Sequence, residues 1–324
     1  MSGHPPRGPG AGRPVAVLVG DIRGSRKMPP PERGKVQDRL RQVLGDLEAA
    51  LGKPGWRGEA PPLVSRLALV AGDEFQGVFL FPAAAILVVR EVAERLHPHR
   101  IRFGLGWGML ATGLSQLPTE MDGPAFHHAQ EAMEAAKADE TFVVFRGFGD
   151  PWDELLTALF RLAGTIRDQW TSTRLRHIRA VRRHAALPAS ARGLLEEAGS
   201  GDRGRDLASS DLFLLWRLLR DGEVATRVTG NASALRNLGS LPAPPARKFF
   251  HGAQKQAARE LGIAPSTLSR SLKQADFFGV TSAEHLATRL LTWFEFHAPG
   301  AAADGQDEGS GPSWPWKRSS GPVP

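Results

Sequence analysis

The fold is decided by one stretch of the chain, Val15-Ala16-Val17-Leu18-Val19-Gly20-Asp21-Ile22-Arg23-Gly24-Ser25-Arg26. An apolar run of strand length ends in an acid, and a basic turn that contains glycine follows at once. This pattern predicts a buried strand over Val15–Gly20 that carries the carboxylate of Asp21 to its C-terminal edge. The backbone N–H groups and arginines of the turn are suited to bind phosphate. The candidate nucleotide-binding residues of this turn are Ile22, Arg23, Gly24, Ser25 and Arg26.

A second stretch repeats the arrangement, Leu67-Ala68-Leu69-Val70-Ala71-Gly72-Asp73-Glu74-Phe75. It predicts a strand over Val64–Ala71 and a hairpin strand over Phe75–Phe81, or a first strand that starts earlier, with Gly72-Asp73 in the turn. Two strand-borne acids, Asp21 and Asp73, predict a shared site for Mg²⁺ or Mn²⁺, because these cations prefer oxygen ligands. The alternative is that both acids are ordinary turn residues, since aspartate and glycine favour turns.

Strands and helices alternate up to residue 147, and the pattern then becomes helical. Apolar spacing predicts helices over Glu32–Leu51, Pro82–Leu96 and Gly123–Ala138, with strands over Ile101–Gly108 and Thr141–Phe145. We therefore expect an α/β (α+β) domain over residues 14–147, with a mixed sheet and helices packed on it. An all-α domain is expected over residues 151–297, and disordered tails over 1–13 and 298–324. Its expected helices are Trp152–Leu162, Thr165–Arg183, Asp211–Arg220, two within Gln254–Gln274, and Ser282–Phe296.

Composition narrows the function classes. The 324 residues carry a formal net charge of +7, which favours a polyanionic partner. The chain contains no cysteine, so disulfides, zinc–thiolate sites and thiol catalysis are excluded. The sequence shows neither a signal peptide nor an apolar run long enough to span a bilayer. We therefore expect a cytoplasmic protein without a membrane partner.

Several motifs resemble those of class III nucleotidyl cyclases. The segment Val17–Gly24 is similar to their first strand, in which a metal-binding acid precedes isoleucine. The hairpin Ala71–Phe75 resembles their second acidic hairpin and the diguanylate cyclase signature, and Ile101–Gly108 is similar to their Arg-x-Gly-Ile-x-x-Gly strand. Three segments in order resemble the bacterial SatD family over about residues 14–146, namely Gly20–Ile22, Gly72–Gln76 and Asp122–His127. The resemblance implies an α/β (α+β) palm domain of the ferredoxin-like, nucleotidyl-cyclase-like type.

The same resemblance bears on activity. Aligned on Gly123, the cyclase asparagine falls at His127 and the transition-state arginine falls at Glu131. An acid at that position repels a triphosphate, so the resemblance implies binding of metal and nucleotide rather than cyclase turnover. Cyclase-fold enzymes commonly share sites across a dimer, and a homodimer is therefore an expectation here as well.

Two adjacent histidines open the helix predicted from Gly123. Consecutive helical side chains point about 100° apart, so His127 and His128 are not expected to share one ion. The pattern favours one partly buried, hydrogen-bonded histidine and one exposed histidine. His127 remains a candidate contact to a phosphate or base of the nucleotide.

Residues 254–275 have the spacing of a DNA-binding helix-turn-helix. Ala258 is small enough for two helices to cross closely, and Gly262 provides the positive φ of the turn. Ile263, Leu268 and Leu272 are expected to face the core. The second helix then presents short polar groups and cations, which suit base edges and phosphates. The candidate DNA-binding residues are Ser266, Thr267, Ser269, Arg270 and Lys273. The alternative is a structural helical hairpin with a solvated face.

Arginines also crowd the region before residue 184, at Arg167, Arg174, Arg176, Arg179, Arg182 and Arg183. This composition fits phosphate contact, and it fits a charged solvated face equally well. The sequence as a whole predicts a transcriptional regulator that couples binding of a nucleotide or divalent cation to binding of DNA. The competing hypothesis is an active nucleotidyl cyclase or nucleotidyltransferase with a helical partner-binding domain.

Overall fold

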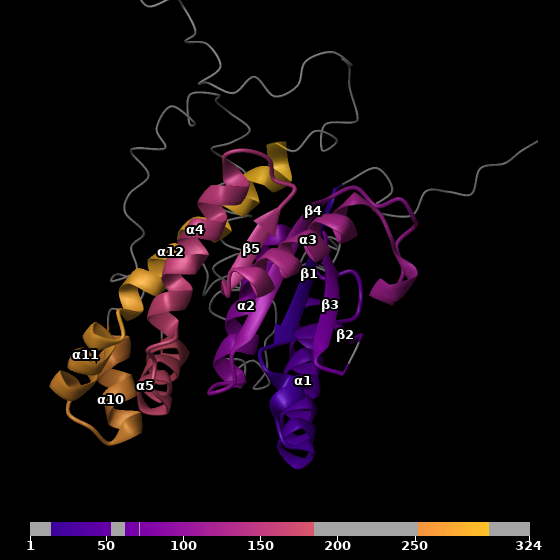
Figure 1. Cartoon of the computed structure of the whole chain (residues 1–324). Coiled ribbons are helices and arrows are strands. Elements are labelled where there is room, and N and C mark those ends of the chain that lie inside the picture. Colours follow the sequence, from indigo (N-terminus) through magenta and orange to yellow (C-terminus); the bar gives the residue numbers. More distant parts are fainter. Residues whose placement is uncertain (1–13, 53–61, 71, 185–251, 298–324) are drawn as a thin grey trace, which may run out of the picture.

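The computed structural model describes residues 14–52, 62–70, 72–184 and 252–297 (Figure 1). Both predicted tails and the predicted helix Asp211–Arg220 lie outside these residues. The strands are β1 (Val15–Ile22), β2 (Ala68–Leu69), β3 (Glu74–Phe79), β4 (Ile101–Gly108) and β5 (Val143–Arg146). The helices are α1 (Pro30–Leu51), α2 (Pro82–Arg95), α3 (Pro124–Ala138), α4 (Trp152–Arg167), α5 (Ser172–Arg183), α10 (Ala253–Leu261), α11 (Pro265–Gln274) and α12 (Phe277–His297), with short 3₁₀ turns η1 (Ser25–Lys27) and η2 (Pro118–Glu120).

The strands form one mixed sheet, as the sequence predicts, and their order within it is β2-β3-β1-β4-β5. Only the β4–β5 pair is parallel, and the other neighbours are antiparallel. β1 lies at the centre, and its residues from Val15 to Val19 are buried, which explains its continuous apolar run. Every later strand is therefore arranged around the stretch that ends in Asp21.

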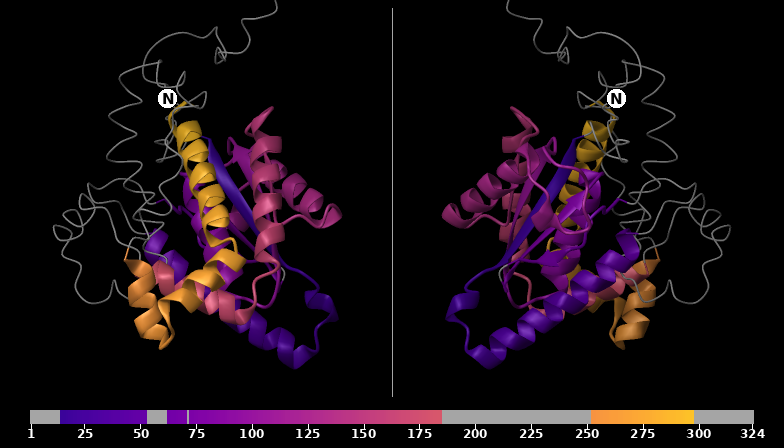
Figure 2. Two further views of the ribbon diagram at one scale, coloured as in Figure 1. Left: turned by 90° about the vertical axis from the view of Figure 1, so that its left-hand side faces the viewer. Right: turned by 90° about the vertical axis from the view of Figure 1, so that its right-hand side faces the viewer.

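Helix α3 covers one face of the sheet, and α2 and α4 cover the other face, with α12 packed against α2 and α4 and α1 packed against α2 (Figures 1 and 2). The alternating glycines of β4 allow α3 to approach closely. A Cβ atom at Gly106 would lie 2.2 Å from the backbone nitrogen of Ala129, and one at Gly104 would lie 2.5 Å from that of Met133. Glycine is required at these two positions because any side chain would push α3 away from the sheet.

The main core continues into the C-terminal helices. Leu156 and Phe160 of α4 and Leu291 and Phe294 of α12 belong to the same buried cluster as the strands. Burying an aromatic or leucine side chain of this kind stabilises a fold by about 1.5–3 kcal/mol. The last described helix therefore packs against the α/β part of the chain rather than apart from it (Figure 2).

Two predicted elements need correction. The strand expected over Val64–Ala71 is limited to β2, because the Ser65 hydroxyl accepts the Val78 N–H at 2.8 Å and interrupts the backbone ladder. The helix break expected near residues 163–164 lies at 168–171 instead. Gly164 is a packing position within α4, against the side chain of Phe142, and the Thr171 hydroxyl caps α5 by accepting the N–H of Arg174 at 3.2 Å.

Among the residues that the structure describes, no helix has both the length and the apolar character needed to cross a bilayer.

Candidate functional site

The two predicted acids lie next to each other at one edge of the sheet. Asp21 pairs with Glu74 of β3 in the antiparallel register, and Asp73 immediately precedes Glu74. The backbone N–H of Ile22 donates to the carbonyl of Asp73 at 3.2 Å. Gly20 is required beside them, because a Cβ atom there would lie 2.3 Å from the Phe75 ring. The central strand and the β2–β3 hairpin thus bring Asp21 and Asp73 together, as the sequence predicts.

Each of these carboxylates already has a protein partner. Oδ2 of Asp21 lies 3.3 Å from a guanidinium nitrogen of Arg102 on β4, which is its register partner. Oδ2 of Asp73 accepts a hydrogen bond from the hydroxyl of the buried Ser25. Lys137, at the end of α3, contacts Glu74 at 3.5 Å. Sequence reasoning missed the roles of Arg102 and Lys137, because both depend on the register of β4 and the docking of α3.

The nearby cations do not fully compensate the negative charge of Asp21 at this edge. Burial raises the pKa of the Asp21 carboxyl above its ordinary value, and the nearby carboxylates of Asp73 and Glu74 raise it further. Lys137 and Arg102 act in the opposite direction without outweighing burial. A half-buried carboxylate in this position is stabilised by additional positive charge.

A divalent cation fits this donor set on chemical grounds. Asp21 and Asp73 offer hard oxygen ligands, and Mg²⁺ usually takes one or two carboxylates while it keeps several waters. Within the described part of the chain, no cluster of three or more acidic, histidine or cysteine side chains is placed to hold a metal by itself. A cation here would therefore rely on these two carboxylates, on water and on a ligand's own oxygens.

The turn after β1 is less open to a phosphate than its sequence indicates. Two of its N–H groups are engaged, that of Ile22 by Asp73 and that of Arg23 by the carbonyl of Arg100 at 2.8 Å. The Arg23 side chain pairs with Glu140 at 2.5 Å. Gly24 adopts the left-handed conformation at φ 72°, and Arg26 is exposed. The predicted residues share one turn, in which Arg26 and the following Lys27 are exposed cations.

His127 lies away from this edge. It sits on the first turn of α3, where Ala125 packs on Gly108, and Gly108 pairs with Val15 at the opposite end of β1 from Asp21. Its ring is exposed and lies 3.3 Å from Asp122. The half-buried His128 ring bonds the carbonyl of Trp107 at 2.8 Å through Nδ1, which confirms the expected contrast between the two histidines. Within one chain, His127 is therefore separated from Asp21 and Asp73.

Helices α10 and α11 are separated by a short turn, as predicted. Gly262 adopts the left-handed conformation at φ 65°, and Pro265 occupies the first turn of α11. Leu268 and Leu272 are buried, and Ile263 is partly buried against the same cluster. The five candidate DNA-binding side chains are all exposed, at Ser266, Thr267, Ser269, Arg270 and Lys273.

Helix α5 packs against both α10 and α11. Its apolar side chains join those of α10 and α11 in a second buried cluster. The His177 ring contacts the Ser271 hydroxyl at 2.8 Å, and the indole N–H of Trp170 donates to the carbonyl of Ala275 at 2.7 Å. These contacts hold α11 with its polar side outward.

A buried group of four charges lies between the α/β part and the C-terminal helices. Arg182 of α5 contacts Glu94 of α2 and Glu284 of α12, the latter at 3.2 Å. Arg167 of α4 contacts the same two acids, at 3.6 Å and 2.7 Å, and stacks 4.9 Å from the Trp170 ring centre. Burial lowers the pKa of the Arg167 guanidinium, whereas the two glutamates raise it. The basic composition of this region predicts phosphate contact or a charged solvated face, and both predictions are wrong for Arg167 and Arg182, whose acidic partners are remote in sequence.

The described elements form an α/β domain, with helices packed on both faces of a mixed five-stranded sheet and two acids at one edge of it. The model of the SatD family matches residues 15–184, more than half of the chain. The chain belongs to the SatD family.

Solved structures with distant similarity include two cyclases. A bacterial light-regulated adenylyl cyclase is 17% identical, with a TM-score of 0.31, and the match covers 41% of this chain and 75% of that one. The guanylyl cyclase Cya2 is 16% identical, with a TM-score of 0.26, over 38% of this chain and 70% of that one. A comparison with curated proteins finds no match.

Proposed function

We propose that this protein is a DNA-binding regulator, in which α10 and α11 form a helix-turn-helix and the cyclase-like domain binds a divalent cation and a nucleotide. The observation that carries the proposal is the division of α11 into two sides. Leu268 and Leu272 are buried, whereas Arg270 and Lys273 are exposed beside short hydroxyl side chains. Such a surface matches the donors and cations that contact base edges and phosphates.

Charge supports the same proposal. The chain carries a formal net charge of +7, so it attracts a polyanion before any specific contact forms. Within the described ranges, Arg270 and Lys273 make no ion pair, and their charges remain available to a ligand. Arg270 suits guanine or phosphate, and Lys273 suits phosphate as a point charge.

Binding in the cyclase-like domain is proposed without turnover. Asp21 and Asp73 would hold Mg²⁺ or Mn²⁺, which would supply positive charge for the phosphates of a nucleotide. Glu131 occupies the position where the resemblance to cyclases implies an arginine, and an acid does not stabilise a triphosphate. The competing proposal, an active nucleotidyl cyclase or nucleotidyltransferase, predicts cyclic nucleotide or pyrophosphate from ATP or GTP.

The DNA test compares the full chain with Arg270→Ala/Lys273→Ala by fluorescence anisotropy on genomic fragments at two salt concentrations. We expect salt-dependent binding by the wild type. The variant should bind more weakly, with its salt slope reduced by about one for each phosphate that it no longer neutralises. Its melting temperature should stay nearly unchanged, because both side chains are exposed. Lys35→Ala/Arg41→Ala removes the same charge from exposed positions of α1 and is the matched control.

Equal binding by the two variants, or no salt-dependent binding by the wild type, would contradict the helix-turn-helix assignment. The metal is tested separately by thermal melting with Mn²⁺ or Mg²⁺, with and without ATP. We expect a rise in melting temperature for the wild type and none for Asp73→Asn. Turnover of ATP or GTP that Asp73→Asn abolishes would favour the enzyme instead.

A further inference from the structure

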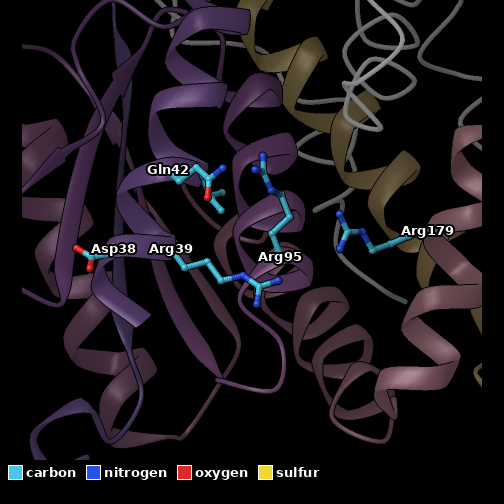
Figure 3. Close-up of a pocket in the computed structure, with 6 residues that line it drawn as sticks. Asp38, Arg39, Gln42, Arg95 and Arg179 are labelled. Carbon is cyan, nitrogen blue, oxygen red and sulfur yellow. The ribbon is translucent and has the colours of Figure 1, made fainter. Parts of the chain in front are cut away.

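A groove rich in arginine lies between α1, α2 and α5, outside both sites considered above (Figure 3). Its larger part has a volume of about 520 Å³ and is lined by Arg39 and Val43 of α1, Arg95 of α2 and Arg179 of α5, among others. A second part of about 310 Å³ shares Arg39 and Arg179 and adds Arg176. We call this concavity the arginine groove. Arg39 and Arg179 extend into it from opposite sides (Figure 3).

The acids near the groove already form ion pairs with other cations of the protein. Asp38 pairs with Arg41 at 2.6 Å, Asp46 pairs with Arg95, and Glu94 belongs to the buried group of four charges. In the described part of the chain, Arg39, Arg176 and Arg179 form no ion pair. Three uncompensated guanidinium groups therefore border one concavity, and their mutual repulsion is relieved by an anion placed between them.

The chemistry of the lining favours phosphate. A guanidinium group donates two parallel hydrogen bonds, which match the oxygens of a phosphate group. Buried Val43 and Leu175 add apolar surface beside these cations. The volume is in the range of small-molecule sites, which are concave and combine apolar walls with a few polar groups.

We propose that the arginine groove binds the phosphate chain of a small phosphorylated molecule, such as a nucleoside triphosphate. This site is distinct from the acidic edge. The Asp21 carboxylate shares the α3 face of the sheet with Gly104 and Gly106, whereas α2 packs on the other face and α1 packs against α2. The proposal thus goes beyond the DNA-binding function. A ligand here would join α1 to α5, and α5 is the helix that packs against α10 and α11.

The experiment measures binding of tripolyphosphate and of ATP to the full chain by isothermal titration calorimetry, with EDTA present so that no divalent cation takes part. The test variant is Arg39→Gln/Arg179→Gln. The matched control is Lys35→Gln/Arg174→Gln, which also removes one cation from α1 and one from α5, but neither of these lines the groove or pairs with an acid that lines it. We expect the test variant to bind about tenfold more weakly or worse for each charge-assisted hydrogen bond that is removed, and the control to bind like the wild type.

Equal affinity for tripolyphosphate and ATP would support recognition of the phosphate chain alone, and tighter binding of ATP would support a nucleotide. Absence of binding to both probes, or an equal loss in the control, would overturn the proposal. Loss of duplex DNA affinity in the test variant, without any loss of small-molecule binding, would also overturn it and assign the groove to nucleic acid. The Arg270→Ala/Lys273→Ala variant should bind tripolyphosphate and ATP normally. Failure of the DNA-binding proposal can therefore be distinguished from failure of the groove proposal.

Discussion

Helix α5 carries arginines that look alike in sequence but differ in burial and in ion pairing. Arg182 points inward, where it meets Glu94 and Glu284 in a buried group of charges. Arg176 and Arg179 border an open groove, and no acid in the described residues pairs with them. The contrast teaches that the role of an arginine depends on whether tertiary neighbours supply a carboxylate, not on the basic character of its own segment.

The buried group of four charges to which Arg182 belongs joins parts of the chain that are far apart. Its four members come from α2, α4, α5 and α12, so the family-matched segment 15–184 and the last helix meet in one ionic group. A buried ion pair contributes little net stability compared with apolar packing, but loss of one partner leaves an uncompensated buried charge. Stability should therefore respond far more to changes on the inward side of α5 than on its outward side.

The largest effect is expected for Arg182→Ala. Among the described residues, the change leaves Arg167 as the one ion-pair partner of the buried Glu94 and Glu284, which should lower the free energy of unfolding by about 3–5 kcal/mol. Urea denaturation followed by circular dichroism measures the loss. Arg176→Ala, on the exposed side of the same helix, is the control and should shift stability by less than about 0.5 kcal/mol. Similar losses in the two variants would remove the contrast between the two sides.

An intermediate effect on stability, which depends on pH, is expected when His177 is replaced. This residue is buried between α5 and α11 beside Ser271. Burial lowers the pKa of this imidazole, and the nearby Arg176 lowers it further. Between the ordinary value of about 6.5 and the lower folded value, the unfolded chain binds a proton that the folded chain does not. Stability should therefore fall as pH decreases below about 6.5.

Thermal melting of wild type and His177→Asn between pH 7.5 and about 5 checks this sign. The variant should be less stable at neutral pH and should lose less stability on acidification. His97 also has a pKa lowered by burial, with His99 and Arg167 adding to the effect, so part of the acid response should remain in the variant. An unchanged pH profile in His177→Asn would assign the whole response to other groups.

The smallest effect is expected for Arg183→Ala. Arg183 is exposed and pairs with Glu260 of α10, and His184 contacts the same carboxylate at 2.7 Å. Water and salt screen such a surface pair, so the loss should be about 0–1 kcal/mol and should shrink as salt increases. Denaturation at two salt concentrations tests this. A loss as large as that of Arg182→Ala would mean that the α5–α10 contact is more important than its exposure indicates.

Local patterns were enough for much of the fold. The apolar run before Asp21 predicts the central strand, because a strand buried on both faces needs apolar residues at every position. Pro82 predicts the start of α2, and Gly262 followed by Pro265 predicts the turn before α11 and the start of that helix. The helix break at 168–171 and the short β2 were not predicted. Gly164 packs against Phe142, and the Ser65 hydroxyl accepts the N–H of Val78, and neither contact can be recognised in the local sequence.

The candidate site divides in the same way. Local sequence is enough to predict which acids reach the sheet edge, since Asp21 and Asp73 each follow an apolar run. It also predicts which side of α11 faces outward, since Leu268 and Leu272 lie four residues apart. In contrast, contacts between distant segments bring Arg102 and Lys137 to the acidic edge, place His127 at the opposite end and neutralise some of the arginines. These outcomes depend on register, helix docking and desolvation, which arise between segments that are distant in the chain.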